Sequence, residues 1–346
     1  MDNDTNSKTQ SARQRRLLSL GTDRLLFEKD SAVAQRIAGY GKDWDEMHII
    51  VATDRKFTET SIAPNVWVYP TRSRVKALYP FSMIRLGRFI IARRGITDIT
   101  CQDPFLCGMA GVSLKKETGL PLELQVHTDI GSPNFPRTLG NRLRKSWALS
   151  YLQKADTVRV VSNKIKDYLV NTLGIAAEKI TVRPIFVDTE AVKAAPVTVD
   201  LHKKYPQFDR IVLVTSRLEP EKDIDLAVRS WPKVLEVFPK SGLIIVGSGS
   251  QMRRLQGLAS RLGLGGSVIF EGWVSDQPTL YSYYKTCDAF LSTSRFEGYG
   301  MALVMAKAAG TKIVSTDVGV AKEVGAMIID WAPESVSHGV VEALAL

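Results

Sequence analysis

The sequence has 346 residues, of which 45% are hydrophobic and 24% are charged, and its formal net charge is +10. This length suits two domains of ordinary size, and the composition is typical of a folded globular protein and excludes collagen-like or wholly disordered chains. No apolar run approaches the roughly 20 residues that a membrane-spanning helix needs. Three cysteines without metal-ligand spacing indicate reduced thiols and a cytoplasmic location.

The chain begins with a polar stretch, residues 1–14, which lacks the apolar core of a signal peptide and is predicted to be a disordered tail. Short apolar runs then alternate with helical stretches over residues 15–190. This alternation predicts a parallel α/β sheet with both faces covered. The expected strands are 15–21, 47–52, 66–69, 96–100, 122–127, 157–161 and 180–184, and a helix is expected over 31–40.

Residues 187–206, which are mixed in character and include Pro196, are predicted to contain a linker, after which the same alternation returns. Residues 207–346 therefore predict a second Rossmann-like sheet. Ligands of open α/β sheets bind beyond the carboxyl ends of the strands, so a cleft between the two sheets is the expected site. The expected strands are 211–215, 243–246, 268–270, 289–291, 312–315 and 327–329, and the expected helices are 224–238, 252–262, 279–285, 301–309 and 333–346.

The basic charge is concentrated in the first part of the chain. Residues 1–195 contain 30 Lys and Arg against 20 Asp and Glu, whereas the remainder contains 16 of each. The first part is therefore expected to meet an anionic partner. Nucleic acid is not the expected partner, because no recognised nucleic-acid motif accompanies the charge.

The segment from Arg72 to Arg94 carries seven basic residues and no acidic one, with aromatic and aliphatic residues between them. Basic amphipathic segments bind anionic membrane surfaces, whereas the simpler interpretation is a helix with a solvated basic face. Both hold if one face packs in the core and the other meets lipid. A second basic cluster follows, with Arg137, Arg142, Arg144 and Lys145.

One stretch late in the chain combines a strand, a glycine-containing turn and a helix start. Glu297 follows the apolar strand that ends at Ser292, and Gly298 and Gly300 precede an apolar helix that stops at Gly310. Glycine permits close backbone approach, and the amides and dipole of a helix N-terminus favour an anion. A carboxylate there holds sugar hydroxyls, although helix capping alone is the alternative role of Glu297. The pattern suggests a sugar diphosphate ligand.

Two motifs resemble those of the family 4 glycosyltransferases, which have the GT-B fold of two Rossmann-like domains with parallel sheets facing a central cleft. Phe296-Glu-Gly-Tyr-Gly-Met-Ala-Leu-Val304 is similar to the E-G-F/Y-G signature of that family. Ser216-Arg-Leu-Glu-Pro-Glu-Lys-Asp223 is similar to its G/S-R-L-x-x-x-K-G segment. The resemblance covers roughly residues 15 to 340. It implies an acceptor domain over 15–190 and a donor domain over 207–346, with the family's last crossover helix expected to be lacking.

The resemblance also implies roles for individual residues. Glu297 and His127 are the expected catalytic residues, with His127 near the transferred sugar and Asp129 in contact with the acceptor or behind it; a structural histidine is the alternative. Arg217 and Lys222 are expected to clamp the donor diphosphate, although a surface loop of mixed charge is the alternative there. The full set of expected donor-binding residues is Arg217, Lys222, Gly247, Val274, Gly298, Tyr299, Gly300 and Met301.

One position departs from the family pattern, because Met305 stands where a second Glu would hold the nucleotide ribose. A methionine side chain cannot accept two hydroxyl hydrogen bonds. Either another residue supplies that contact, or the nucleotide is held more weakly, or the site is degenerate.

The expected function is transfer of a sugar, with retention, from a nucleotide diphosphate-sugar to a lipid-linked or saccharide acceptor in the biosynthesis of cell-surface glycans. No metal and no cofactor are expected, because the D-x-D patterns that begin at Asp43 and Asp223 do not follow strands. The expected location is cytoplasmic, or peripheral on the inner face of the membrane. The alternative is a catalytically degenerate GT-B protein that acts as a membrane-surface binding module.

Overall fold

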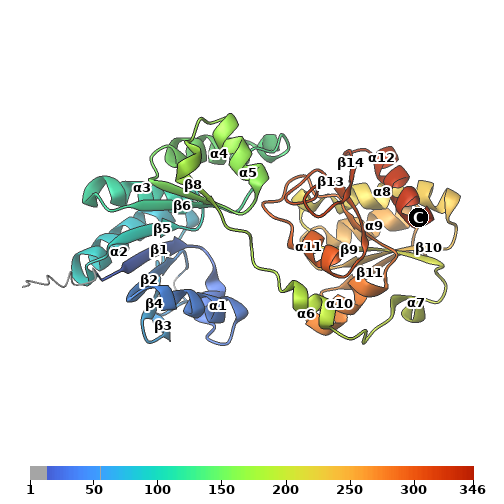
Figure 1. Ribbon diagram of the computed structural model, residues 1–346, viewed down its shortest axis with the longest axis horizontal. Helices are drawn as coiled ribbons and strands as arrows, with labels where there is room; N and C mark the ends of the chain where they lie inside the picture. Colours follow the sequence, from blue (N-terminus) through green and yellow to red (C-terminus); the bar gives the residue numbers. More distant parts are fainter. Residues whose placement is uncertain (1–13, 55) are drawn as a thin grey trace, which may run out of the picture. The chain divides into compact units, whose positions relative to one another are not determined.

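The computed structural model describes residues 14–54 and 56–346, so the predicted tail lies, except for Gln14, outside the described residues. The chain divides into two compact units, each built around one sheet (Figure 1). The first unit comprises Met1–Val126, Leu143–Arg159 and Ile175–Thr181, and the second comprises His127–Arg142, Val160–Gly174 and Val182–Leu346.

The sheet of the first unit has eight strands in the described residues, in the order β3-β4-β2-β1-β5-β6-β7-β8. All the pairings of β1, β2, β4, β5 and β6 with one another are parallel, whereas β3 runs antiparallel to β4 at the edge. The strands are β1 (Arg16–Gly21), β2 (Glu46–Val51), β3 (Thr60–Ala63), β4 (Val66–Pro70), β5 (Asp98–Cys101), β6 (Leu122–Val126), β7 (Thr157–Val160) and β8 (Ile180–Val182).

Helices that follow these strands begin and end at residues that suit helix termini. Ser31 accepts a hydrogen bond from the Ala34 amide at 3.1 Å, so it caps the first helix. The second helix ends at Gly95, which has the left-handed backbone that glycine adopts without strain. The helices from this part of the chain are α1 (Ala32–Tyr40), α2 (Tyr79–Arg94), α3 (Leu106–Thr118), α4 (Leu139–Leu152) and α5 (Asn163–Asn171).

The second sheet has six strands in the described part of the chain, in the order β11-β10-β9-β12-β13-β14, and every pairing is parallel. The chain leaves β9 toward β10 on one side and later returns to β12 on the other side. The strand order therefore reverses between β9 and β12. The strands are β9 (Arg210–Thr215), β10 (Ser241–Val246), β11 (Val268–Gly272), β12 (Ala289–Ser292), β13 (Lys312–Thr316) and β14 (Met327–Ile329).

Both faces of the second sheet are buried. Leu243 and Ile245 of β10 pack in one apolar cluster, whereas Ile244 and Val246 pack in another. This alternation is the two-residue period of a strand, and it explains why each strand reads as a continuous apolar run. The helices are α6 (Thr189–Ala194), α7 (Leu201–Lys204), α8 (Ile224–Val237), α9 (Met252–Arg261), α10 (Gln277–Thr286), α11 (Met301–Ala308) and α12 (Pro333–Ala345).

The strands predicted from the sequence are all present, with bounds that differ by one or two residues. Two features differ from the expectation. The antiparallel edge strand β3 was not predicted, because Thr60-Ser-Ile-Ala63 is short and has no apolar alternation. The segment 187–206 contains the short helices α6 and α7, which begin beside the capping residues Asp188 and Asp200.

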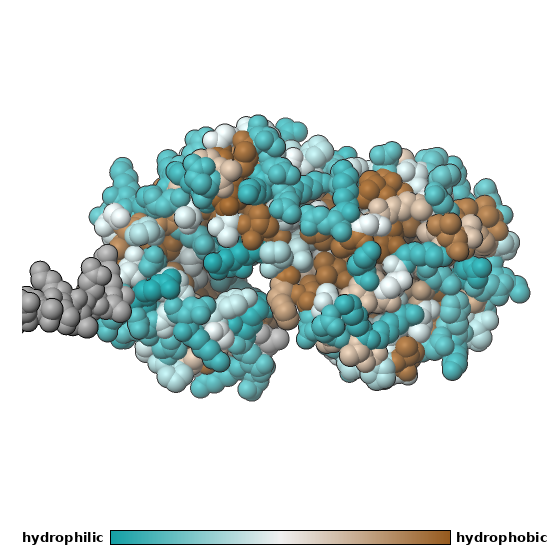
Figure 2. Space-filling model, in the orientation of Figure 1, coloured by the Kyte–Doolittle hydropathy of each residue, from teal (hydrophilic) through white to brown (hydrophobic). Residues whose placement is uncertain are grey.

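The surface drawn in Figure 2 is mostly hydrophilic and is interrupted by separate apolar patches. Among the described residues, no helix combines the length and the apolar character that crossing a bilayer requires.

A buried histidine lies within the first sheet. Nδ1 of His48 is 3.0 Å from the Tyr69 hydroxyl, and Nε2 is 2.9 Å from a Glu46 carboxylate oxygen. The ring is fully buried and stacks on Trp67, with 4.9 Å between ring centres. Burial lowers the pKa of His48 below its ordinary value of 6.5, although the hydrogen bond that the ring makes to the Glu46 carboxylate acts in the opposite direction.

We expect this histidine to make the protein less stable in acid. The unfolded chain binds the proton more tightly than the folded chain does, so the free energy of unfolding falls as pH drops below 6.5 toward the lowered folded pKa. His48→Gln should reduce this dependence. Urea unfolding of both proteins at about pH 7.5 and about pH 5.5 measures the difference. Equal pH dependence in the two proteins would contradict the prediction.

Candidate donor site at the switch point of the second sheet

The loops that follow β9 and β12 diverge at the point where the strand order reverses. In open α/β sheets this topological switch point forms a crevice at the carboxyl ends of the strands. Residues 216–223 follow β9, and residues 293–300 follow β12. The two loops are tied by the Thr293 hydroxyl, which donates to the carbonyl oxygens of Lys222 at 3.2 Å and Asp223 at 3.0 Å.

Lys222 and Glu297 meet across this crevice. The Lys222 ammonium forms a hydrogen-bonded ion pair with Oε1 of Glu297, and the side chains are only 13% and 20% exposed. The hydroxyl of Ser294 donates to the same carboxylate oxygen at 2.9 Å. The two residues that the sequence assigned to the diphosphate and to the sugar therefore lie side by side, and each holds the other in position.

Arg217 lies on the outer part of the same loop. Its guanidinium contacts the Glu221 carboxylate at 3.0 Å, and its side chain is 65% exposed. An exposed ion pair of this kind contributes little to stability, so an incoming anion displaces it at low cost. Arg217 is thus available to a ligand, whereas Lys222 is already held.

Asp223 stands at the position of the glycine in the motif that this loop resembles. Its φ is 46°, which is in the left-handed region that Asp tolerates better than most residues. Its carboxylate forms an ion pair with Arg295 at 2.9 Å, and the Arg295 amide donates to the Glu221 carbonyl at 2.8 Å. These contacts hold the two loops together beside Lys222 and Glu297.

The start of α11 supplies backbone amides next to Glu297. Gly300 precedes the helix with φ of 93°, a conformation that glycine adopts without strain. The first amides of a helix have no partner within the helix, and they favour an anion. Gly298 permits close approach of another backbone, because a Cβ there would lie 1.9 Å from the carbonyl oxygen of His127.

The loop after β10 is also close to the loop after β9. A Cβ at Gly247 would lie 1.8 Å from the Ser216 carbonyl oxygen. The carboxylate of Glu219 accepts hydrogen bonds from the amide and the hydroxyl of Ser250, at 3.0 and 2.6 Å, and these bonds lower the pKa of Glu219. The Ser250 amide is therefore occupied by a carboxylate of the protein itself, which limits this loop as an anion site.

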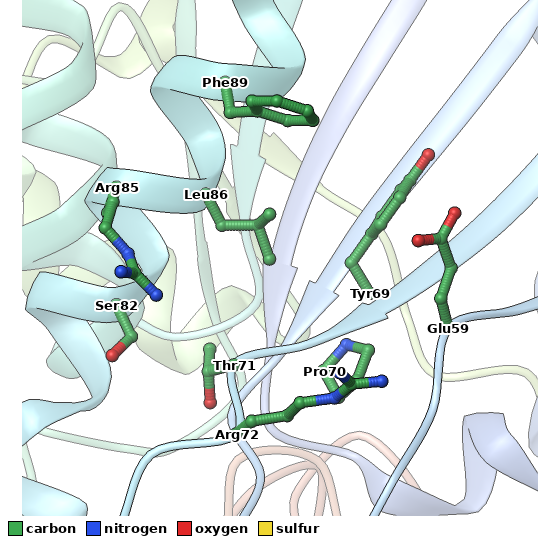
Figure 3. A pocket seen from close by; sticks show the side chains of 9 residues that line it. All are labelled: Glu59, Tyr69, Pro70, Thr71, Arg72, Ser82, Arg85, Leu86 and Phe89. Carbon is green, nitrogen blue, oxygen red and sulfur yellow. The ribbon is translucent and has the colours of Figure 1, made fainter.

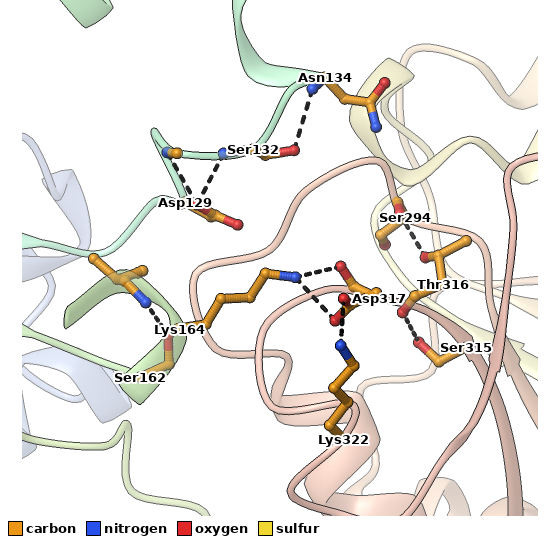
Figure 4. Close-up of polar contacts among 12 residues, drawn as sticks. Asp129, Ser132, Asn134, Ser162, Lys164, Ser294, Ser315, Thr316, Asp317 and Lys322 are labelled. Atoms are coloured by element: carbon orange, nitrogen blue, oxygen red, sulfur yellow. Dashed lines mark hydrogen bonds and ion pairs between the residues drawn. The ribbon is translucent and has the colours of Figure 1, made fainter. Parts of the chain in front are cut away.

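Two segments that follow strands of the first sheet belong to the second unit, namely 127–142 and 160–174 (Figure 4). The Ser132 hydroxyl donates to the Arg295 carbonyl at 3.2 Å, and Phe135 packs edge-on against Phe296. The Lys164 ammonium contacts Asp317, whose carboxylate also pairs with Lys322 at 2.9 Å.

These contacts adjust the electrostatics of the loop after β13. Burial acts to raise the pKa of Asp317, but its bonds to Lys322 and Lys164 lower it overall, so the carboxylate stays charged. The Val320 amide donates to the Tyr299 carbonyl at 2.9 Å, which joins this loop to the turn before α11.

The predicted catalytic His127 is half-buried directly after β6, and its backbone lies against Gly298. Asp129 is buried, and its Oδ1 accepts hydrogen bonds from the Gly131 and Ser132 amides, both at 3.0 Å. Asp129 thus shapes its own loop, which favours a positioning role over contact with an acceptor. The roles of both residues stay predictions.

The other predicted residues are placed as follows. Tyr299 is half-buried, and burial raises its pKa. Met301 is 43% exposed at the first turn of α11, and Val274 is half-buried after β11, beside the exposed Trp273. Met305 packs against an apolar cluster of the core, so its side chain is used in packing.

Comparisons with known proteins identify the family of this chain. Residues 34–191 match the family described as Glycosyltransferase Family 4, and residues 201–328 match the family described as glycosyl transferases group 1. The chain belongs to the family 4, group 1 glycosyltransferases. Both motifs that suggested the family lie inside the second matched range.

Individual relatives of this chain are distant. An uncharacterised glycosyltransferase of Methanocaldococcus jannaschii, MJ1607, is 26% identical over 71% of this chain and 66% of its own length. A D-inositol 3-phosphate glycosyltransferase of Segniliparus rotundus is 26% identical over 70% of this chain and 57% of its own length. The matched residues thus span less than two thirds of each curated relative.

A solved structure establishes the fold. Anabaena Alr3699/HepE in complex with UDP has a TM-score of 0.68 and 18% identity, and the match covers 95% of this chain and 94% of that one. Together with the two parallel α/β sheets, this likeness shows that the chain has the GT-B fold.

Sequence reasoning missed several residues that shape the candidate site. Arg295 and Ser294 precede the recognised motif and hold Asp223 and Glu297. Glu219 fixes the loop at Ser250 from 31 residues away. Their position next to motif residues was the available signal, but their partners depend on loops that only the fold brings together.

Proposed function

We propose that this protein is a glycosyltransferase that moves a sugar from a nucleotide diphosphate-sugar to a lipid-linked or saccharide acceptor. The observation that carries the proposal is the pairing of Lys222 with Glu297 at the switch point, beside the amides that begin α11. A cation and backbone amides suit a diphosphate, and a carboxylate suits sugar hydroxyls.

The proposed mechanism concerns the leaving group. Negative charge builds on the diphosphate as the bond to the sugar breaks, and Arg217, Lys222 and the amides from Gly298 to Met301 stabilise that charge. Glu297 orients the sugar hydroxyls once the diphosphate draws Lys222 toward itself, and His127 contacts the sugar. No metal or cofactor takes part, because the lysine and arginine supply the positive charge.

The names of similar proteins support parts of this proposal. Alr3699/HepE was solved with UDP, and the Segniliparus relative is named for D-inositol 3-phosphate. We propose retention of configuration because the family resemblance implies it, and the anomeric form of the product, determined by NMR, tests this. We also propose a cytoplasmic protein that works at the inner face of the membrane in glycan biosynthesis, which cell fractionation tests.

Arg217→Ala should abolish selective binding of the donor nucleotide. The side chain is largely exposed, and its ion pair with Glu221 lies within the loop that follows β9, so the variant should fold normally. Calorimetry with UDP, GDP, ADP and their common sugar conjugates, on both proteins, measures the loss. Turnover is then assayed with EDTA present, because the proposed mechanism requires no metal.

Near-normal nucleotide binding and turnover in Arg217→Ala would contradict the proposal that this loop binds the donor diphosphate. Absence of binding in the unmodified protein would instead favour the degenerate alternative. That alternative has one observation in its favour, because Met305 packs in the core where the family pattern has a ribose-binding Glu.

A further inference from the structure

A cavity of about 490 Å³ lies in the first unit, between the end of β4 and the helix α2 (Figure 3). Tyr69, near the end of β4, lines the strand side of the cavity. Arg72 lies in the loop that follows this strand. Arg85 and Phe89 come from the helix, and Glu59 lies beside Tyr69. The volume is that of a site for a small molecule or head group.

The backbone holds Arg72 in an unusual conformation at the mouth of this cavity. Its φ is 51°, in the left-handed region that costs a non-glycine residue about 1–3 kcal/mol. Hydrogen bonds on both sides maintain it. The Thr71 amide donates to the carbonyl oxygen of Val51, the last residue of β2, and the Ser73 amide donates to that of Thr53, both at 3.0 Å. The Nε of Arg72 donates to the Phe57 carbonyl at 3.0 Å, which fixes the plane of its guanidinium.

The two arginines of the cavity have no acidic partner. Among the described residues, neither Arg72 nor Arg85 forms an ion pair, whereas Arg88 on the same helix makes two hydrogen bonds of 2.7 Å to Glu117. Guanidinium groups without a carboxylate partner suit a phosphate, which they bind in a bidentate manner. Among the described residues that line the cavity, Glu59 supplies the carboxylate, a group that can accept hydrogen bonds from hydroxyls.

The helix face that bears Arg85 alternates between aromatic and basic residues. Phe81, Arg85, Phe89 and Arg93 are spaced four apart, so they lie along one face of α2. Phe81 and Phe89 are 62% and 51% exposed, and the Arg93 guanidinium lies 4.2 Å from the centre of the Phe89 ring. Exposed aromatic rings beside cations suit the boundary between lipid head groups and acyl chains.

We propose that this cavity binds the phosphate-bearing polyol head group of an amphiphilic acceptor. Arg72 and Arg85 bind the phosphate, Glu59 accepts polyol hydroxyls, and Phe81 and Phe89 contact the adjoining apolar chain. The identification of the ligand as the acceptor rests on the proposed function, whereas the binding itself does not. A lipid head group and a free polyol phosphate share this chemistry, and the lipid is the source that the aromatic residues favour.

The test uses the full chain, glycerol 3-phosphate as the soluble probe, and vesicles of pure phosphatidylglycerol against vesicles of pure phosphatidylcholine. The variants are Arg72→Gln, Arg85→Gln and the control Arg88→Gln, which removes the same charge from the same helix outside the cavity. Calorimetry measures glycerol 3-phosphate, and sedimentation measures vesicle binding. Thermal melting checks that each variant is folded.

The wild type should bind glycerol 3-phosphate and should prefer phosphatidylglycerol vesicles. Arg72→Gln and Arg85→Gln should each weaken binding of the soluble probe about tenfold or more, and Arg88→Gln should leave it unchanged. Equal effects of all three substitutions, or no binding by the wild type, would overturn the site. The site would also be overturned if glycerol 3-phosphate failed to compete with vesicles for the protein and Arg72→Gln failed to weaken vesicle binding.

The variant Phe89→Ala distinguishes the two sources of the phosphate, namely a lipid head group and a free polyol phosphate. This variant should reduce vesicle binding and leave glycerol 3-phosphate affinity within about twofold, because the ring contacts the apolar chain. Unchanged vesicle binding in Phe89→Ala would overturn the lipid as the source.

Failure of this inference is distinguishable from failure of the proposed function, because no nucleotide is present in these measurements. UDP binding, measured in parallel, should be the same in Arg72→Gln and the wild type. Binding of glycerol 3-phosphate by a protein that turns over no nucleotide-sugar would overturn the acceptor assignment, even though the cavity binds phosphate.

Discussion

Lys222→Ala is expected to lower kcat by about 100- to 1000-fold, which is the effect of removing one preorganised donor from a developing negative charge. The ammonium is held by Glu297 in a largely buried position, so it is placed before the donor arrives. The substitution removes the ion pair of the Glu297 carboxylate and leaves its hydrogen bond from the Ser294 hydroxyl, so the carboxylate that should orient the sugar loses much of its restraint. Release of nucleoside diphosphate under saturating donor and acceptor measures the loss.

The matched control is Lys233→Ala, which removes a lysine from α8 in the same unit. Its ammonium contacts Glu334 at 3.0 Å, but both side chains are about half exposed or more, and they lie outside the switch-point loops. This variant should keep wild-type turnover, because exposed ion pairs contribute little. A kcat for Lys222→Ala within threefold of that of Lys233→Ala would refute the assignment of Lys222 to the leaving group.

The fold was predictable because its determinants are local. The central strands β9, β10, β12 and β13 of the second sheet carry apolar residues that are buried on both faces, and turns with glycine or aspartate separate strands from helices. β3 escaped prediction for the opposite reason. Thr60-Ser-Ile-Ala63 becomes a strand through its antiparallel pairing with β4, and no local sequence pattern predicts that pairing.

The motif residues of the site could be predicted from the sequence, but the residues that they contact could not. The spacing in the motifs placed Lys222 and Glu297 on loops after two strands, but the contact between them follows from the strand order β10-β9-β12. The same holds for Asp223 and Arg295, which are 72 residues apart and form an ion pair. Pairings of this kind depend on the crossover of the sheet, which sequence spacing alone does not give.

The cavity of the first unit shows a similar limit. The positive charge of the segment from Arg72 to Arg94 made it recognisable in the sequence. In the structure, one part of this segment packs in the core and another part is exposed. Met83, Gly87 and Ile90 are buried in the core, whereas Phe81 and Phe89 are exposed. Charge counting predicted an anionic partner, whereas the place of the proposed anion site follows from the left-handed backbone of Arg72 and from the cavity that Arg72 and Arg85 both line.

Gly247→Ala is expected to lower the free energy of unfolding of the second unit by about 3 kcal/mol or more. The added Cβ would lie 1.8 Å from the Ser216 carbonyl oxygen. That oxygen belongs to the backbone and the position of a Cβ is fixed by its own backbone, so no side-chain rotation relieves the contact. The φ of 140° adds strain for an L side chain, of about 1–3 kcal/mol. The melting temperature should fall by roughly 5–10 °C, and differential scanning calorimetry measures it.

The same substitution should weaken UDP binding more than tenfold, because a shift at Gly247 moves the Ser216–Lys222 loop that it contacts. Gly263→Ala is the control, since Gly263 also has a positive φ, 69°, but a Cβ there meets no heavy atom within 4 Å. It should cost only the backbone strain, about 1–2 kcal/mol, and leave UDP affinity unchanged. If both variants lose stability and affinity equally, close packing of Gly247 against Ser216 is not what positions the Lys222 loop, and the donor site must be sought elsewhere.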